Sequence, residues 1–207
     1  MTRTLQLIRG ATLLATISLT LTTPMTAIAA ESGPWQLRLG ASLVDPKDDN
    51  GSLAGADASV SREAGPSLGV TYFLTANLAA DLLLATPFRH DVSLNGNRIG
   101  DVEHLPPVLS LQYHFRPEAR IRPYVGAGIN YTFFMHERMP GGDNLKLDDS
   151  MGMALQAGVD VPLDQHLSMG LDVRHLDIDS KASLNGTNIG TARIDPLVWT
   201  LSASYRF

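Results

Sequence analysis

The sequence feature that most constrains the fold is a two-residue hydrophobic period that recurs in eight stretches after residue 34. Because successive side chains of a β-strand point to opposite faces, each stretch has one apolar face and one polar face. The stretches lie within residues 35–43, 67–72, 78–85, 109–115, 124–133, 151–161, 167–174 and 197–207. No part of this region has a sustained helical period, so the chain is predicted to be all-β.

The spacing of these stretches indicates a membrane barrel. Each stretch with its flanks covers about nine to eleven residues, the length that a tilted strand needs to cross a bilayer. Short connections at residues 75–77, 116–121 and 162–166 alternate with long ones at residues 44–65, 87–106, 135–149 and 177–196. We therefore predict an eight-stranded antiparallel transmembrane β-barrel with short periplasmic turns and longer extracellular loops. A soluble barrel or sandwich would alternate too, but the uniformly apolar face here favours lipid outside the barrel.

The first 30 residues have the composition of a secretory signal peptide. Two arginines are followed by an apolar run over residues 11–21, which is too short to anchor the chain as a membrane-spanning helix. The small residues after this run predict cleavage after Ala29 or Ala30. The barrel domain is then residues 31–207.

Composition and spacing argue against several classes of function. The formal net charge of −5 argues against a nucleic-acid partner. The six histidines show no metal-ligand spacing, and His175 with Asp177 lacks the serine partner of a hydrolase. The sequence therefore predicts no enzyme activity, no cofactor and no metal centre. Acidic runs at residues 45–49 and 148–149 leave open a calcium site near lipopolysaccharide, although such runs are more often solvated loops.

Several short motifs resemble those of the OmpW family of outer-membrane proteins. They are residues 85–90 (ATPFRH), 104–107 (HLPP), 122–132 (RPYVGAGINYT), 158–160 (GVD), 177–179 (DID) and 205–207 (YRF). The resemblance implies an eight-stranded barrel in a Gram-negative outer membrane that passes small hydrophobic molecules. Met151 stands where members of this family often carry a bulky aromatic residue, so a gate built on that ring is not expected in the same form.

The strand pattern also predicts which side chains line the lumen. An eight-stranded barrel is just wide enough to be filled by its own side chains, and a polar lumen is usual. In the external half, however, the inward positions are small or apolar, which predicts a hydrophobic pocket. Its lining residues are Leu83, Ala85, Val108, Ala154, Leu176 and Val198. Nearer the periplasm we predict a paired ionic floor made by Arg38, Asp81, Asp160, Asp172, Arg174 and Arg206.

These two layers predict that a small hydrophobic molecule binds in the external half. Because it cannot pass the ionic floor, we expect it to leave sideways into the membrane. Pro66, Pro107 and Pro196 lie at external strand ends, where each removes a donor from strand pairing. A closed inert barrel stays open as an alternative. So does a structural or adhesive barrel whose external loops contact lipopolysaccharide, host cells or phage.

Two further features bear on assembly and on the loops. The aromatic end formed by Tyr205 and Phe207 resembles the signal that the barrel-assembly machinery reads. The other expected partners are outer-membrane lipid and lipopolysaccharide, and we expect the protein to be a monomer. Asn-Gly pairs at residues 95–96 and 185–186 predict two tight hairpins that extend the external loops.

Overall fold

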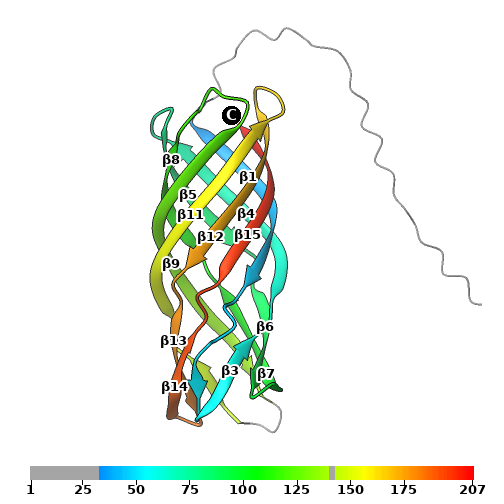
Figure 1. Ribbon diagram of the computed structural model, residues 1–207, viewed down its shortest axis with the longest axis vertical. Helices are drawn as coiled ribbons and strands as arrows, with labels where there is room; N and C mark the ends of the chain where they lie inside the picture. Colours follow the sequence, from blue (N-terminus) through cyan, green and yellow to red (C-terminus); the bar gives the residue numbers. More distant parts are fainter. Residues whose placement is uncertain (1–32, 140–142) are drawn as a thin grey trace, which may run out of the picture.

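The computed structural model describes residues 33–139 and 143–207, and in them eight long antiparallel strands close into a barrel (Figure 1). The barrel strands are β1 (Trp35–Asp45), β4 (Glu63–Phe73), β5 (Leu78–Ala85), β8 (Val108–His114), β9 (Arg122–Arg138), β11 (Ser150–Pro162), β12 (Leu167–Leu176) and β15 (Leu197–Arg206). Each pairs with the next along the chain, and β15 pairs with β1 to close the ring. The predicted fold class is confirmed. The predicted signal peptide lies outside the described residues.

The two ends of the barrel differ as the loop lengths predict. The short turns lie together at one end, beside the C-terminus at the top of Figure 1. The long loops form an extension at the other end from β2 (Ser52–Leu53), β3 (Ala56–Val60), β6 (Phe88–Leu94), β7 (Asn97–Leu105), β10 (Leu145–Leu147), β13 (Asp179–Leu184) and β14 (Thr187–Arg193). Strand β9 is long enough to run from the barrel wall into this extension, where it pairs with β7.

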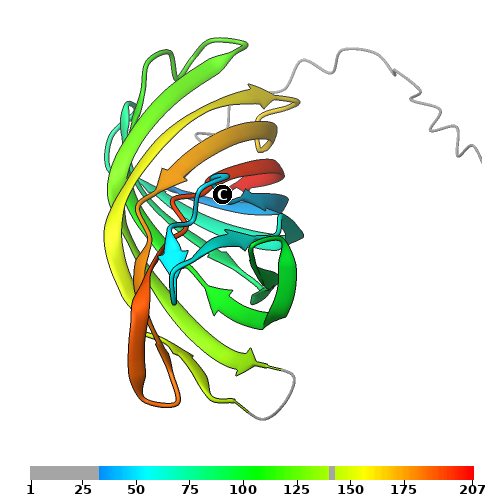
Figure 2. The same ribbon diagram turned by 60° about the horizontal axis from the view of Figure 1, so that its bottom comes forward.

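The Asn-Gly pairs close two hairpins in the extension, β6–β7 and β13–β14. Asn95, Gly96, Asn185 and Gly186 all have positive φ, between 47° and 82°, as a type I′ turn requires. Figure 2 turns this end forward and shows the two hairpins on different sides of the barrel mouth. The extension therefore continues the barrel wall outward as paired strands.

The two faces of each barrel strand are strongly different. On β15, Leu201 points outward and is 58% exposed, whereas the neighbouring Ser202 points into the lumen and is 6% exposed. Aromatic pairs such as Trp35–Tyr72 and Tyr131–Phe133, each with ring centroids 4.7 Å apart, lie toward the two ends of the outer face. Such aromatic girdles mark the membrane interfaces of an outer-membrane barrel.

Within residues 33–139 and 143–207, no helix is long and apolar enough to span a bilayer.

The outward position of Leu201 predicts a position-dependent effect of charge. Leu201→Arg places a guanidinium in the middle of a membrane-spanning strand and should destabilise the barrel by roughly 2–4 kcal/mol. The matched control is Leu163→Arg, because Leu163 is exposed in a periplasmic turn. The folded fraction in lipid, measured by heat-modifiable gel mobility, should fall only for the first variant. Equal folding of both variants would contradict the lipid-facing assignment.

Candidate functional site

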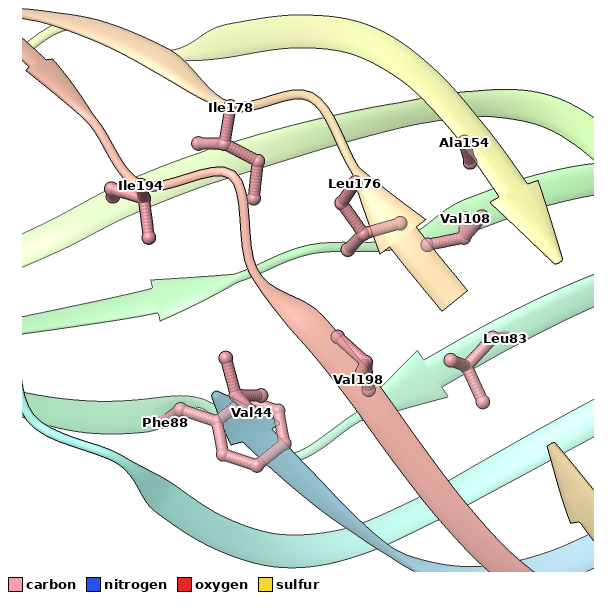
Figure 3. Close-up of a cluster of buried hydrophobic side chains, with 9 residues drawn as sticks. All are labelled: Val44, Leu83, Phe88, Val108, Ala154, Leu176, Ile178, Ile194 and Val198. Carbon is pink, nitrogen blue, oxygen red and sulfur yellow. The ribbon is translucent and has the colours of Figure 1, made fainter. Parts of the chain in front are cut away.

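The external half of the barrel contains an apolar cluster (Figure 3). Of the pocket residues predicted from the sequence, five are fully buried in this cluster and Ala85 packs against it. The cluster consists of Val44, Leu83, Phe88, Val108, Ala154, Leu176, Ile178, Ile194 and Val198, and we call it the lower cluster. Six of these side chains come from the barrel strands β1, β5, β8, β11, β12 and β15, and the other three come from the external segments that connect barrel strands, so the apolar layer is built from several sides of the barrel.

The lower cluster is packed, whereas the sequence led us to expect an open pocket. Four side chains that the sequence analysis did not assign to the lumen help to fill it: Val44, Phe88, Ile178 and Ile194. Val44 lies on the same face of β1 as the inward-pointing Arg38 and Ser42, so the two-residue alternation already predicted that it points into the lumen. Ile178 and Ile194 lie between strands, where parity does not apply. An eight-stranded barrel is narrow enough for a few such side chains to close it.

The ionic floor lies on the periplasmic side of the lower cluster, and Arg38 and Arg174 organise it. The Arg38 guanidinium binds both Asp160 carboxylate oxygens, with two N–O distances of 2.7 Å. Arg174 binds Asp81, with Nη2 2.9 Å from Oδ2. The Thr71 hydroxyl joins the two pairs, because it accepts a hydrogen bond from Arg38 Nε and donates one to Asp81. Both pairs therefore belong to one buried network.

Asp172 extends this network to the opposite wall. Its carboxylate lies 3.3 Å from Arg174 Nη2 and accepts hydrogen bonds from the Tyr124 hydroxyl and from the Gln156 amide. Gln156 also accepts a hydrogen bond from Ser110. Tyr124 and Gln156 were not among the predicted site residues, although their inward parity was visible. Charge-assisted hydrogen bonds of this kind offset the cost of burying the ions.

Arg206 is a correction to the predicted floor. Its guanidinium carbon lies 3.8 Å from the centroid of the Phe73 ring, and its Nε donates to the backbone oxygen of Gly33. Arg206 points inward as its parity requires, but it lies at the periplasmic end of β15, below the paired residues. Two arginines and three aspartates therefore form the floor, rather than the three of each expected from the sequence.

The floor and the lower cluster meet almost without a gap. A cavity of about 10 Å³ is lined by residues of both layers, among them Leu83, Tyr124 and Arg174. That volume is close to the space that one water molecule needs. The axial route toward the periplasm is therefore closed to an organic molecule in this structure.

A groove on the lipid-facing surface approaches the lower cluster from the side. It has a volume of about 360 Å³ and is lined by Leu39, Pro66, Ser67, Leu68, Leu84, Ala85 and Thr86. Ala85 lines the groove and also packs against the lower cluster. A Cβ atom added to Gly65 would lie 3.0 Å from the Phe88 ring, so this ring packs against the backbone beside Pro66. Ala85 thus contacts both the groove and the lower cluster, and Phe88 of that cluster packs against Gly65, next to Pro66 of the groove.

A pair of buried histidines lies on the external side of the lower cluster. His90 of β6 and His104 of β7 stack with ring centroids 4.7 Å apart, and Phe88 and Phe134 flank the His104 ring. Beyond them is a second apolar cluster in the extension, formed by Leu53, Ala58, Val92, Val102, Leu147, Ala182 and Ala192. Burial and the neighbouring His90 ring lower the pKa of His104 to about 3, and burial also lowers the pKa of His90.

The remaining predicted positions lie away from the lumen. Met151 faces outward and is 71% exposed, so it does not line the interior. Tyr205 and Phe207 are exposed on the outer face, with ring centroids 6.0 Å apart, and their role in assembly stays a prediction. A further acidic group was not expected from the sequence: carboxylate oxygens of Asp177, Asp179 and Asp195 lie within 4.8 Å of one another. Lys47 and Arg193 lie against this group as counter-charges.

The floor predicts a large penalty for removing one member of a buried pair. Asp160→Asn leaves the Arg38 charge uncompensated and should lower the free energy of unfolding by about 3–5 kcal/mol. Asp45→Asn, which removes the partner of the exposed Arg62, should cost no more than about 1 kcal/mol. Urea unfolding from lipid vesicles, followed by tryptophan fluorescence, measures both values. Similar losses for the two variants would contradict the buried network.

The histidine pair predicts that the extension loses stability in acid. Below about pH 6.5 the unfolded chain takes up a proton at His104 that the buried ring, with its pKa lowered to about 3, does not, so folding loses up to about 1.4 kcal/mol per pH unit. The lowered pKa of His90 acts in the same direction. Amides of β6 and β7 should therefore exchange hydrogen through local opening more readily at pH 5 than at pH 7, after correction for intrinsic rates. His104→Phe should remove part of this difference. The same protection at both pH values in the unsubstituted protein would contradict the prediction.

The sequence and the structure were compared with known proteins. A sequence model described as the OmpW family matches residues 31–207. Outer membrane protein W of Escherichia coli is 38% identical over 194 residues, covering 87% of this chain and 92% of that protein. The crystal structure of OprG from Pseudomonas aeruginosa superposes with a TM-score of 0.75 at 32% identity, covering 85% of this chain and 96% of OprG.

A more distant relative has a name that refers to a metabolic operon. The dibenzothiophene metabolism operon protein PahQ of Pseudomonas aeruginosa is 26% identical over 191 residues, covering 86% of this chain and 90% of PahQ. The family match spans the whole described barrel, and the relatives include outer-membrane proteins of Gram-negative bacteria. This chain therefore belongs to the OmpW family and is a β-barrel of the Gram-negative outer membrane.

Proposed function

We propose that the protein binds a small hydrophobic molecule in the external half of its lumen and releases it sideways into the outer membrane. The observation that carries this proposal is the order of the two interior layers: the lower cluster lies directly outside the ionic floor. A molecule that replaces side-chain contacts of the cluster meets apolar surface there. Farther in, it meets buried ion pairs with which it can form no hydrogen bonds.

Energetics favours a sideways route over an axial one. An apolar molecule that entered the floor would separate charges and leave polar groups unpaired, which costs several kcal/mol for each buried ion. The groove beside Pro66 offers an alternative, because Ala85 lines it and also packs against the lower cluster. The backbone oxygen of Pro66 accepts a hydrogen bond from the Thr86 N–H, but Pro66 has no N–H to return one on this β5 side of β4. Rearrangement at this point would connect the cluster with lipid.

The name of one relative fits an apolar ligand. PahQ is named for an operon of dibenzothiophene metabolism, and dibenzothiophene is a fused aromatic compound without a charged group. This supports a hydrophobic molecule as the class of ligand without identifying the compound that the present protein takes.

Substitutions inside the lower cluster test the binding step. Val198→Asp introduces a charge or an unmatched carboxyl group and should weaken binding of naphthalene by about 1–3 kcal/mol. Ala154→Trp should crowd the packed cluster sterically and occupy the volume that a ligand would take by displacing its side chains. The control is Ser204→Ala, near the periplasmic end of β15. Naphthalene fluorescence reports binding, and heat-modifiable mobility shows that each variant has folded.

A substitution in the groove tests the exit step separately. Thr86→Trp fills the groove from an exposed position and should leave binding unchanged while slowing transfer of naphthalene into the surrounding bilayer several-fold. Met151→Trp places the same ring on the lipid face of β11 as a control. Normal transfer by Thr86→Trp would exclude exit through this groove.

If Val198→Asp and Ala154→Trp fold and still bind naphthalene normally, the lumen is not the binding site. A function of the external loops would then be the better interpretation.

A further inference from the structure

We propose that the histidine pair is a hydrogen-bonding subsite for a hydroxyl group, so that the preferred ligand is an apolar molecule bearing one hydroxyl, such as a phenol or an alcohol. This inference rests on the proposed function and narrows its class of ligand. Its basis is a set of fully buried polar atoms without hydrogen-bond partners among the described residues, on the external side of the lower cluster.

His104 carries two of these atoms. Its side chain is 1% exposed, and neither ring nitrogen has a hydrogen-bond partner among residues 33–139 and 143–207. The Nε2 atom of fully buried His90 likewise has no partner in the described part of the chain. Leaving a buried donor or acceptor unpaired costs about 1–3 kcal/mol, so such atoms need a specific explanation.

The hydrogen-bonding capacity of the pair follows from its neighbours. The Nδ1 atom of His90 lies 2.6 Å from the backbone oxygen of Ser61, which only accepts, so Nδ1 carries the proton and Nε2 of the neutral ring is an acceptor. The neutral ring of His104 offers one donor and one acceptor. The two rings together therefore present one free donor and two free acceptors.

More unpaired polar atoms follow along β9, toward the barrel. The Thr132 hydroxyl and the Asn130 amide nitrogen are fully buried and have no hydrogen-bond partner among the described residues. Phe134, on the same face of β9, is opposite His104, whereas Asn130 is opposite Val108 of the lower cluster. A series of unpaired polar groups thus leads down one wall into the apolar cluster.

A hydroxyl group fits this arrangement better than a hydrocarbon or an anion. It can donate one hydrogen bond to a free acceptor of the pair and accept one from the free donor, while the rest of the molecule contacts the lower cluster. A hydrocarbon leaves all these atoms unpaired. A carboxylate or phosphate would bring a charge into a site flanked by Phe88 and Phe134, at high desolvation cost. A single metal ion must lie in both imidazole planes, which two stacked rings do not allow.

The test compares two probes that differ by one hydroxyl group, naphthalene and 1-naphthol. Transfer of each into vesicles that contain lipopolysaccharide is measured at pH 7 and corrected with protein-free vesicles. His104→Phe keeps a stacked aromatic ring but removes both unpaired nitrogens, so it should fold. His104→Gln keeps a donor and an acceptor. His175→Phe is the matched control, because His175 is exposed on the outer face of β12.

We expect the ratio of 1-naphthol transfer to naphthalene transfer to fall about fivefold in His104→Phe, the effect of losing roughly one hydrogen bond. Naphthalene transfer should be unchanged in that variant. His104→Gln should keep much of the preference, and His175→Phe should keep all of it. In the unsubstituted protein, 1-naphthol and not naphthalene should shift the ¹⁵N resonances of the His104 ring.

The outcomes separate this inference from the proposed function. If both probes are transferred but His104→Phe leaves their ratio unchanged, the hydroxyl subsite is wrong while lumen transfer stands. An unshifted His104 resonance in the presence of saturating 1-naphthol would overturn the subsite as well. If the unsubstituted protein transfers neither probe above the protein-free rate, the proposed function fails, and the inference fails with it.

Discussion

The width of an eight-stranded barrel in hydrocarbon is the constraint on which the rest of this structure depends. Every backbone group that faces lipid must be paired, so the sheet closes, and closing eight strands leaves room only for side chains. What the protein does inside the membrane is therefore decided by which side chains fill each level. The two-residue alternation along each strand decides which side chains point into the lumen. On β15, for example, Leu201 faces lipid while Ser202 faces the lumen.

The interior has two layers of opposite chemistry, and each layer makes the other effective. Hydroxyl and amide groups support the Arg38–Asp160 and Arg174–Asp81 pairs, although Arg174 Nη1 has no hydrogen-bond partner among the described residues. The lower cluster covers this network from outside. An apolar molecule that displaces side chains of the cluster keeps its hydrophobic surface covered, whereas water or an ion gains little there. Under the proposed function, the order of the layers favours apolar ligands and stops them at the same depth.

The sequence allowed prediction of those features that depend on the two-residue alternation along the strands and on the family motifs. It predicted the fold class, and it assigned Leu83, Val108 and Leu176 to one apolar level and Arg38 with Asp160 to a polar one. Parity does not describe the loops, so Ile178 and Ile194 were missed, and it gives only approximate height, so Arg206 was placed too near the floor. The His90–His104 pair could not be read from the turn alone. The Asn-Gly turn at residues 95–96 sets Leu94 opposite Asn97, a register that, continued regularly, would place His90 opposite Asp101. A β-bulge between Val92 and Ser93 shifts the register by one residue, so that His90 lies opposite Val102 and diagonal to His104.

A lumen filled by its own side chains has a further consequence for selectivity. A ligand bound as proposed must replace contacts among Phe88, Ile178 and their neighbours, so much of the apolar energy that it gains was already present in the empty protein. Apolar surface alone then discriminates weakly, as it does between substrates that differ by one methylene group. Polar atoms that lack partners behave differently, because satisfying them adds hydrogen bonds that no side chain supplied before. In such an interior the large differences between ligands arise at the few unpaired groups. Among the described residues, five of the eight buried side-chain atoms without a hydrogen-bond partner belong to His90, His104, Asn130 and Thr132, whereas the other three belong to Asp101, His166 and Arg174.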